Sequence, residues 1–227
     1  MIFDYVIIGN SAGGVGAVEA IREVDLEGSI TVISEEPFPP YSRPMITHYL
    51  TGEVSADSLR YRPKDFYESN LVKAILGKKA VSIDFNHRKI ELHDGEKVGY
   101  EKLLLATGGK PFLPKIEGAD KDGIFTFTNL SDGINVRNYL KNVKTAVVIG
   151  GGLIGISVAE ALIKLGVEVY IVELKDRILS LVLDEKGSML AEKAVREAGA
   201  NILTSHTVRE IVGKEDNKNI VGGAILD

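Results

Sequence analysis

The chain has 227 residues, of which 44% are hydrophobic, and its 27 basic and 32 acidic residues give a formal net charge of −5. This length and apolar content allow one large or two ordinary globular domains, and the absence of a basic block argues against nucleic acid or an acidic membrane surface as a partner. Because the sequence contains no cysteine, these residues cannot form disulfides, thiolate metal sites or a cysteine redox centre.

We also expect no membrane-spanning segment. The longest nearly uncharged stretch, residues 145–159, contains four glycines and is too short to cross a bilayer. The N-terminus carries Asp4 where a secretory signal would be positively charged. The sequence therefore predicts a cytoplasmic protein without a membrane partner.

The first elements predict a βαβ unit around a glycine-rich turn. Apolar periodicity indicates a strand over 4–8, a helix over about 13–24 and a strand over 30–34. The first strand leads into Gly9-Asn10-Ser11-Ala12-Gly13-Gly14, whose glycines permit a tight turn and leave helix N-terminal amides free to receive a pyrophosphate. Glu35 follows the second strand, where a carboxylate can accept hydrogen bonds from an adenosine ribose.

Residues 36–44 come next, and their four prolines disfavour continued helix or sheet. This composition fits a functional loop and a proline-stiffened surface connection equally well.

An antiparallel element is predicted over 79–105. It consists of strands at 80–84, 89–93 and 100–105, with Asp94-Gly95 as a hairpin turn, and it ends at Ala106-Thr107-Gly108-Gly109. Residues 110–143 are interpreted as a connector with one helix, for which Ser131 or Asp132 offers the N-cap. A domain boundary is expected in this connector.

A second βαβ unit is predicted over about 144–173. Its first strand leads into Gly150-Gly151-Gly152-Leu153-Ile154-Gly155, and Glu173 ends its second strand. A helix over 185–198 and strands within 201–226, around a polar turn at 214–219, complete the chain. Because the whole strand, turn, helix, strand and acid pattern occurs twice, we expect two neighbouring dinucleotide sites that exchange hydride.

The chain carries the two glycine fingerprints, Ala106-Thr107-Gly108 after an apolar strand and Tyr41-Ser42-Arg43-Pro44 after the first acid. On these motifs it resembles the pyridine nucleotide-disulfide oxidoreductases, flavoproteins that bind two dinucleotides. The chain is most similar to the branch of NADH oxidases, rubredoxin reductases and nitrite reductase flavin subunits. The resemblance covers Tyr5 to about Ile211 and implies an α/β fold with two Rossmann-like domains. The two domains are a split FAD-binding domain, whose first segment covers 1–110, and an incomplete NAD(P)-binding domain over 144–227. The connector over 111–143 lies between them in the sequence.

By the same resemblance, FAD binds the first fingerprint and NAD(P)H the second. Hydride then passes to the flavin, and electrons leave to an external acceptor such as a small redox protein, oxygen or a small molecule. The implied cofactor-binding residues of the first half are Gly9, Ser11, Ala12, Gly14, Glu35, Arg43, Pro44, Val81, Ala106, Thr107 and Gly108. Those of the second half are Gly150, Gly152, Leu153, Ile154, Gly155 and Glu173.

Several positions keep more than one interpretation. Ser11 replaces the usual second glycine and asks for more room at the pyrophosphate. Val81 can equally be ordinary core, and Thr107 can simply close a turn. His48 falls where related ferredoxin reductases often have a lysine near the flavin, although a solvated or structural histidine is the more common case.

No catalytic residue is assigned. Ser157 stands where many relatives carry a glutamate near the nicotinamide, so gating by a carboxylate does not carry over. Glu160, one helical turn further along, is interpreted as a buried or capping helix residue as readily as a group near the nicotinamide. We expect NADH to be favoured over NADPH, because Glu173 would repel a 2′-phosphate, with Lys175 and Arg177 weakening that preference.

The thiol chemistry of the family does not carry over, because no cysteine is present. Relatives continue beyond the position of Asp227 with the rest of the NAD domain, a Gly-Asp motif that returns to the flavin and an interface domain that often forms a dimer. We therefore expect a homodimer, or a fragment or subunit that another chain completes. These residues alone should fold at least in part and bind FAD weakly or not at all. A dinucleotide-binding sensor without turnover is the alternative from another functional class.

Overall fold

The computed structural model describes residues 1–227 and contains two compact units. The first unit comprises residues 1–42 and 56–110, and the second comprises 43–55 and 111–227. Segments 43–55 and 111–143 both belong to the second unit. The chain therefore passes between the units at three places. The FAD-binding segment expected over 1–110, the connector over 111–143 and the NAD(P)-binding domain over 144–227 stay predictions.

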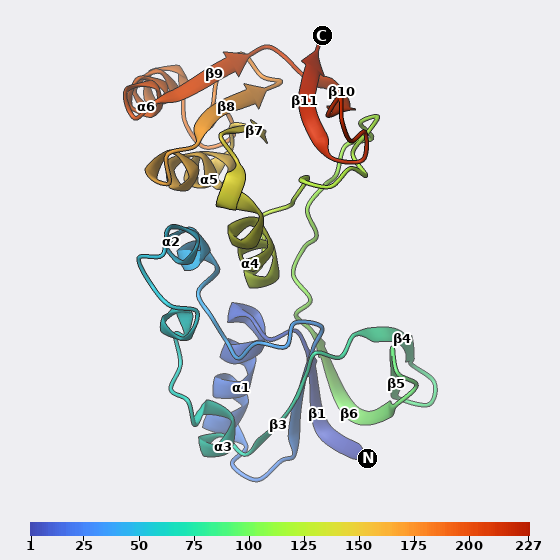
Figure 1. Cartoon of the computed structure of the whole chain (residues 1–227). Coiled ribbons are helices and arrows are strands. Elements are labelled where there is room, and N and C mark those ends of the chain that lie inside the picture. The colour runs from blue at the N-terminus through green and yellow to red at the C-terminus, as the bar shows by residue number, and fades with distance from the viewer. The chain divides into compact units, whose positions relative to one another are not determined.

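The first unit is built on a six-stranded mixed sheet (Figure 1). Its strands, in the order in which they lie in the sheet, are β3 (Val72–Leu76), β2 (Ile30–Ser34), β1 (Ile2–Ile8), β6 (Lys97–Leu105), β5 (Lys89–Leu92) and β4 (Ala80–Asp84). The pairings among β3, β2, β1 and β6 are parallel, and those of β4 with β5 and β5 with β6 are antiparallel. The helices are α1 (Ala12–Val24) and α3 (Phe66–Ser69), with a single 3₁₀ turn over Asp57–Leu59.

Both faces of this sheet are covered, as the alternation along β1 shows. Ile7 packs with Val15 and Val18 of α1 on one face. Val6 and Ile8 belong to a separate cluster on the other face, which includes Ile90 of β5. Because successive strand residues point to opposite faces, the consecutive buried residues Val6, Ile7 and Ile8 fit a sheet that is buried on both sides.

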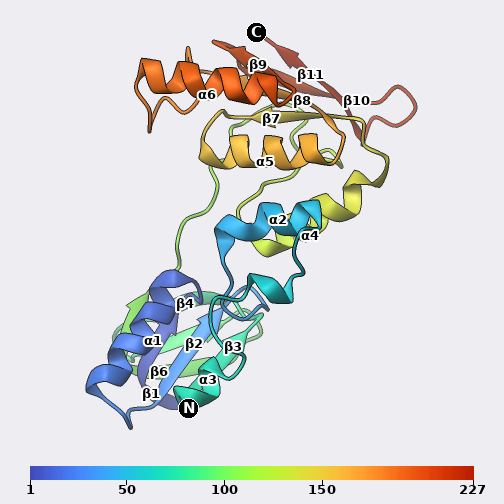
Figure 2. The ribbon, with the colours of Figure 1, turned by 90° about the vertical axis from the view of Figure 1, so that its left-hand side faces the viewer.

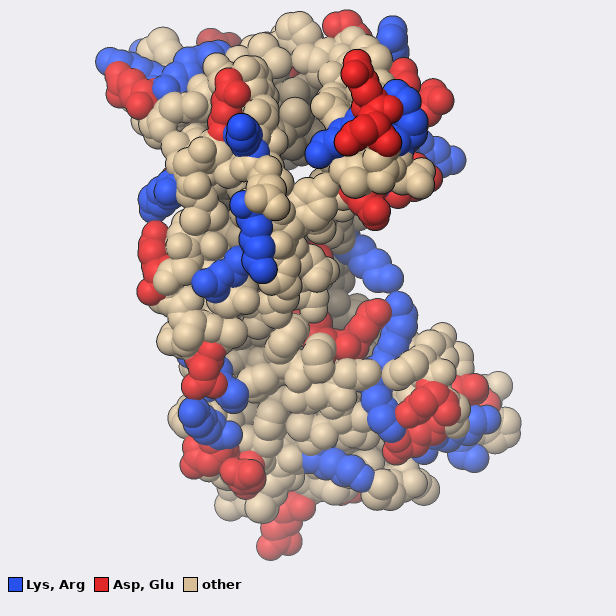
Figure 3. Space-filling view, in the orientation of Figure 1, with Lys and Arg blue, Asp and Glu red and all other residues tan.

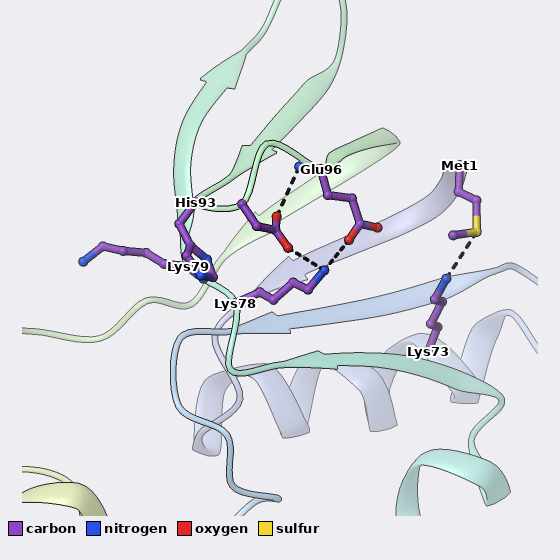
Figure 4. A network of polar contacts seen from close by, with 7 residues as sticks. Met1, Lys73, Lys78, Lys79, His93 and Glu96 are labelled. Atoms are coloured by element: carbon purple, nitrogen blue, oxygen red, sulfur yellow. Dashed lines mark hydrogen bonds and ion pairs between the residues drawn. The ribbon is translucent and has the colours of Figure 1, made fainter.

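Polar contacts fasten the β4–β5–β6 element beside the parallel strands (Figure 4). The Lys78 ammonium lies 2.7 Å from a carboxylate oxygen of Asp94 and 2.6 Å from one of Glu96, and these two hydrogen bonds raise the pKa of Lys78. The backbone N–H of Lys79 donates to His93 Nδ1 over 3.2 Å. These contacts fix the segment between β3 and β4 to the turn between β5 and β6.

The second unit contains a three-stranded parallel sheet and a separate hairpin. The sheet has the order β7 (Thr145–Ile149), β8 (Glu168–Glu173) and β9 (Ala200–Thr204), and the hairpin pairs β10 (Val208–Gly213) with β11 (Val221–Leu226). Helices α5 (Leu153–Lys164) and α6 (Glu185–Glu197) connect the parallel strands and cover the same face of the sheet (Figure 2). Ala159, Val169 and Ile171, each 0% exposed, lie in the core between sheet and helices.

Segment 43–55 is held in the second unit by a small core. It contains a 3₁₀ turn over Arg43–Met45 and helix α2 (Ile46–Thr51), which packs against α5 and α4 (Leu130–Tyr139). Leu50 of α2 is 2% exposed and shares a cluster with Val136 and Ala161. A Cβ at Gly133 would lie 2.6 Å from Ile46, so α2 and α4 approach as closely as a glycine allows.

The start of α4 differs from the expected one. Its N-cap is Asn129, not Ser131 or Asp132. The Asn129 side chain accepts a hydrogen bond from the Asp132 backbone N–H, and the Asp132 carboxylate accepts one from the Asn129 N–H. This reciprocal arrangement is a capping box, in which the acid belongs at the third helical position and not at the cap.

The surface carries mixed charge on the face seen in Figure 3, where basic and acidic side chains are interspersed. None of the helices combines the length and apolar composition needed to cross a membrane.

Candidate functional site

The first glycine turn connects β1 to α1 and is closed by two tight backbone approaches. Gly9 has a φ of +122°, and a Cβ there would lie 2.0 Å from the Ala106 carbonyl oxygen. A Cβ at Gly14 would lie 1.9 Å from the Gly9 carbonyl oxygen. Both positions therefore require glycine, because any side chain would collide with rigid backbone.

The amides at the start of α1 are left available by this turn. Ser11 occupies the N-cap position but its side chain makes no capping hydrogen bond. Ser11 is half-buried, and the next residues, Ala12 and Gly13, are exposed. A helix N-terminus without a side-chain cap presents N–H donors and positive partial charge, which suits a phosphate group.

A series of side-chain hydrogen bonds supports the first turn from outside. Tyr67 of α3 donates its hydroxyl to Asn10 Oδ1 over 2.9 Å, and Asn10 Nδ2 donates to the Phe38 carbonyl over 3.0 Å. Burial raises the pKa of Tyr67 to about 12, so its hydroxyl stays protonated above the pH at which an ordinary tyrosine ionises. The turn, helix α3 and the loop after β2 are thus joined through one amide.

The other predicted residues of the first unit are mostly exposed. Glu35 follows β2 and forms an ion pair with Lys79 over 2.9 Å, its side chain being 61% exposed. Val81 is 52% exposed, so it is not ordinary core. Ala106 is half-buried behind the turn, and the Thr107 and Gly108 that follow are exposed, with Gly108 at a φ of +67°.

Arg43 and Pro44 belong to the second compact unit. Both are exposed, and Arg43 Nη1 donates to the Thr128 carbonyl over 2.6 Å. Their neighbour His48 is held by Glu53, with 2.5 Å between His48 Nδ1 and a Glu53 carboxylate oxygen. That hydrogen bond is the main reason why the pKa of Glu53 is lowered.

The second glycine turn repeats the backbone shape of the first. Gly150 has a φ of +106°, and a Cβ at Gly155 would lie 2.0 Å from the Gly150 carbonyl oxygen. Gly152 caps α5 without a side-chain bond, and Leu153 and Ile154 are 63% and 57% exposed in the first turn of the helix. The turns differ at their first glycine, because a Cβ at Gly150 would have no atom within 4 Å.

Glu173 braces this second turn. Its Oε2 accepts a hydrogen bond from the Gly151 N–H and its Oε1 accepts one from the Lys175 N–H, each over 2.7 Å. Leu179 donates its N–H to the Gly151 carbonyl over 2.8 Å, so Gly151 is held on both sides. A carboxylate oxygen has two acceptor sites, which leaves Glu173 able to accept further hydrogen bonds.

Helix α5 carries the remaining polar candidates on its surface. Ser157 is exposed. Glu160 is neither buried nor a cap, which corrects that interpretation: its side chain is 62% exposed and pairs with Lys164 over 3.0 Å. Because a position one helical turn from another shares its face, an i,i+4 ion pair accounts for Glu160 without any cofactor.

Three residues that shape these turns were missed from the sequence, namely Asn10, Tyr67 and Gly151. Asn10 and Gly151 occupy the same position of the repeated motif. Comparing the two copies of the motif could therefore have singled out this position from the sequence. No local signal links Tyr67 to a turn 57 positions earlier in the chain.

Comparisons with known proteins agree with this geometry. Residues 3–224 match the sequence model of the family described as pyridine nucleotide-disulphide oxidoreductase. The chain is 38% identical over 90% of its length to the epsilon subunit of the NADH-dependent phenylglyoxylate dehydrogenase of Aromatoleum evansii, covering 48% of that protein. It is 30% identical over 94% of its length to a rubredoxin-NAD(+) reductase of Pseudomonas putida, covering 56% of that protein.

A solved structure is similar over nearly the whole chain. The covalent complex of putidaredoxin reductase with putidaredoxin gives a TM-score of 0.90 at 28% identity, over 99% of this chain and 55% of the matched one. The chain thus spans about half the length of each of these three relatives.

Proposed function

Because the chain belongs to the pyridine nucleotide-disulphide oxidoreductase family, we propose that its first glycine turn binds FAD and its second binds NADH. The observation that carries the proposal is the repeated turn. In each copy a glycine lies so close to the backbone that an added Cβ would be about 2 Å from a carbonyl oxygen. Each turn also leads into a helix N-terminus without a side-chain cap. Such a turn fits the pyrophosphate of a dinucleotide, which needs close backbone approach and N–H donors.

In the first unit, Gly9, Ser11, Ala12 and Gly14 would receive the FAD pyrophosphate and Glu35 the adenosine ribose. Val81, Ala106, Thr107 and Gly108 would complete the flavin site of this unit, and the resemblance also assigns Arg43 and Pro44 to FAD. When bound, the flavin supplies the capacity to accept a hydride and release electrons.

In the second unit, Gly150, Gly152, Leu153, Ile154 and Gly155 would form the NADH turn, and Glu173 would accept a ribose hydrogen bond. The same carboxylate would repel a 2′-phosphate, which favours NADH over NADPH. Lys175 is exposed and Arg177 is paired with Asp176 over 3.0 Å, so neither cation neutralises Glu173 by direct contact. Affinities measured for both cofactors test this assignment, and tighter binding of NADPH would reverse it.

The electron acceptor we propose is external, and a small redox protein is the first candidate. Two observations on relatives support it: one is named a rubredoxin-NAD(+) reductase, and a similar structure is a complex of a reductase with putidaredoxin. Oxygen and small molecules are the competing acceptors. The chain contains no cysteine, so none of its residues can carry electrons to the acceptor as a redox thiol.

Anaerobic spectroscopy of the protein supplied with excess FAD tests the proposal. We expect NADH to bleach the flavin absorbance bands, and we expect the bands to recover when an oxidised rubredoxin or ferredoxin is added. Flavin bands that NADH leaves unchanged would support the alternative of a dinucleotide-binding sensor, and bleaching reversed by oxygen alone would move the acceptor assignment to oxygen.

A subunit role is the second candidate, since the 38% identical relative is itself a subunit of a larger enzyme. In that case the acceptor would be a partner chain. Copurification of a partner whose redox centre is reduced when NADH is added would favour it over a homodimer.

A further inference from the structure

The two glycine turns differ in what holds them. In the second turn, the acid at the end of the next strand reaches back: Glu173 accepts the N–H of Gly151, the residue after the first glycine. In the first turn, the corresponding acid Glu35 pairs with Lys79 and is 61% exposed. Another group must therefore fix the first turn.

Asn10 stands at the motif position of Gly151, and its side chain is engaged at both ends. Its oxygen accepts from Tyr67 over 2.9 Å and its amide nitrogen donates to Phe38 over 3.0 Å. Because one planar amide makes both bonds, rotation of Asn10 would break both together. The amide is thus a brace between the turn and two other segments.

Tyr67 is itself fixed in place. Its ring meets that of Phe66 edge to face, with centroids 5.6 Å apart, and it packs against the cluster that contains Ile7 and Val15 on either side of the turn. A partly buried ring with so few free torsions loses little entropy when its hydroxyl is held.

We propose that Asn10 and Tyr67 hold the first glycine turn in the shape that receives a dinucleotide, with Tyr67 acting as a positioning residue through Asn10. The functional part of this inference rests on the proposed binding of FAD at that turn. Tyr67 touches no cofactor in this scheme. It sets the orientation of the Asn10 amide and, through it, the position of the backbone between Gly9 and Ser11.

The structure offers a matched control in Tyr61. Tyr61 packs against the same cluster as Tyr67, but its hydroxyl is buried without a hydrogen-bond partner. Tyr61→Phe and Tyr67→Phe therefore remove the same atom from the same core, and only the second removes a link to the turn. Loss of an unpartnered hydroxyl is expected to be neutral or stabilising.

The test measures FAD affinity and backbone exchange in Tyr67→Phe, Asn10→Ala, their double variant and Tyr61→Phe. We expect Tyr67→Phe and Asn10→Ala each to weaken FAD binding about tenfold. The double variant should bind FAD no more than twofold more weakly than the weaker-binding single variant, because both residues act in one chain of hydrogen bonds. Tyr61→Phe should bind FAD as wild type does. Additive losses, or an equal loss in Tyr61→Phe, would overturn the proposal.

Hydrogen exchange separates this inference from the proposed function. The N–H groups of Gly9 and Val15 are bonded to Ile33 and Ser11, on either side of the turn. They should exchange severalfold faster in Tyr67→Phe and Asn10→Ala than in wild type or Tyr61→Phe, with or without cofactor. If the wild type binds no FAD, the proposed function fails while this measurement still decides the role of Tyr67; unchanged exchange would refute that role.

Discussion

The two glycine turns share one backbone shape and differ in their surroundings. Both begin with a glycine at positive φ. In both, a Cβ added to the last glycine would collide with the carbonyl oxygen of the first. The first turn also abuts the Ala106 carbonyl and is braced by Asn10, whereas the second has open space at Gly150 and is braced by Glu173. The repeated motif thus specifies the turn itself, while each unit supplies its own support.

The largest expected difference between the turns comes from their first glycines. Gly9→Ala would combine an unfavourable φ with a collision against the Ala106 carbonyl, whereas Gly150→Ala would meet only the unfavourable φ. We expect Gly150→Ala to cost about 1–3 kcal/mol of unfolding free energy and Gly9→Ala about 1–3 kcal/mol more, from overpacking against backbone. Urea unfolding followed by circular dichroism, with hydrogen exchange to assign the affected unit, measures both.

Gly16→Ala is the control for that pair. Gly16 lies in the exposed middle of α1 with nothing within 4 Å of a Cβ, so alanine there should stabilise the helix by up to about 1 kcal/mol. Equal costs for Gly9→Ala and Gly150→Ala would show that the Ala106 contact yields easily, and the contrast between the turns would disappear.

The second contrast concerns the two acids. Glu173→Gln leaves one accepting oxygen where two backbone N–H groups need acceptors, and the new amide would face the other N–H. We expect it to destabilise the second unit by about 1.5–3 kcal/mol, the value of a hydrogen bond to a charged group, and to weaken NADH binding more than tenfold. Glu35→Gln, which disturbs only an exposed ion pair, should leave the stability of the first unit nearly unchanged.

Thermal unfolding and cofactor titration of both variants test that contrast. An acid that merely contacted the ribose would change affinity without changing stability, so a stable Glu173→Gln protein with weak NADH binding would contradict the bracing role.

The sequence predicted the elements around each turn better than the contacts between distant segments. The α/β fold with parallel strands is confirmed, as is membership of the family. Strand β3, helix α3 and helix α2 were not predicted. Helices α3 and α2 have only four and six residues, and α2 is stabilised by tertiary burial of Leu50 against Val136 and Ala161. Propensity alone cannot reveal such packing.

The candidate site divides in the same way. Gly9, Gly14, Gly150 and Gly155 follow from local backbone geometry, which the motif encodes directly. The bracing of the first turn requires Tyr67, and the partnership of Glu35 with Lys79 requires the hairpin after β3. These contacts exist only once the fold has formed, so the cofactor roles carried by the resemblance stay predictions.

A smaller expected difference between the two turns is the pH dependence of the Tyr67 hydrogen bond, which supports only the first turn. Burial raises the pKa of Tyr67 from 10 to about 12, which favours the neutral hydroxyl in the folded state. The contribution of the neutral Tyr67 hydroxyl to the stability of the folded state is therefore complete below pH 10 and is lost as the pH rises through about 12. Ultraviolet titration of tyrosinate should show a late step near that pH that is missing in Tyr67→Phe; persistence of the full late step would assign it to another tyrosine.

The smallest effect is expected at Lys79, which pairs with the acid of the first turn. Its ammonium lies 2.9 Å from Glu35, but the two side chains are 44% and 61% exposed, so solvent screens the pair. Lys79→Met should weaken FAD binding less than threefold, and the difference from wild type should vanish at high salt. Lys97→Met, which breaks an exposed pair with Glu91 elsewhere in the same unit, is the control and should not change FAD affinity at all. A loss of tenfold or more that persists in high salt would mean that Lys79 contacts the cofactor itself, and the first turn would then have a cationic partner that the second turn lacks.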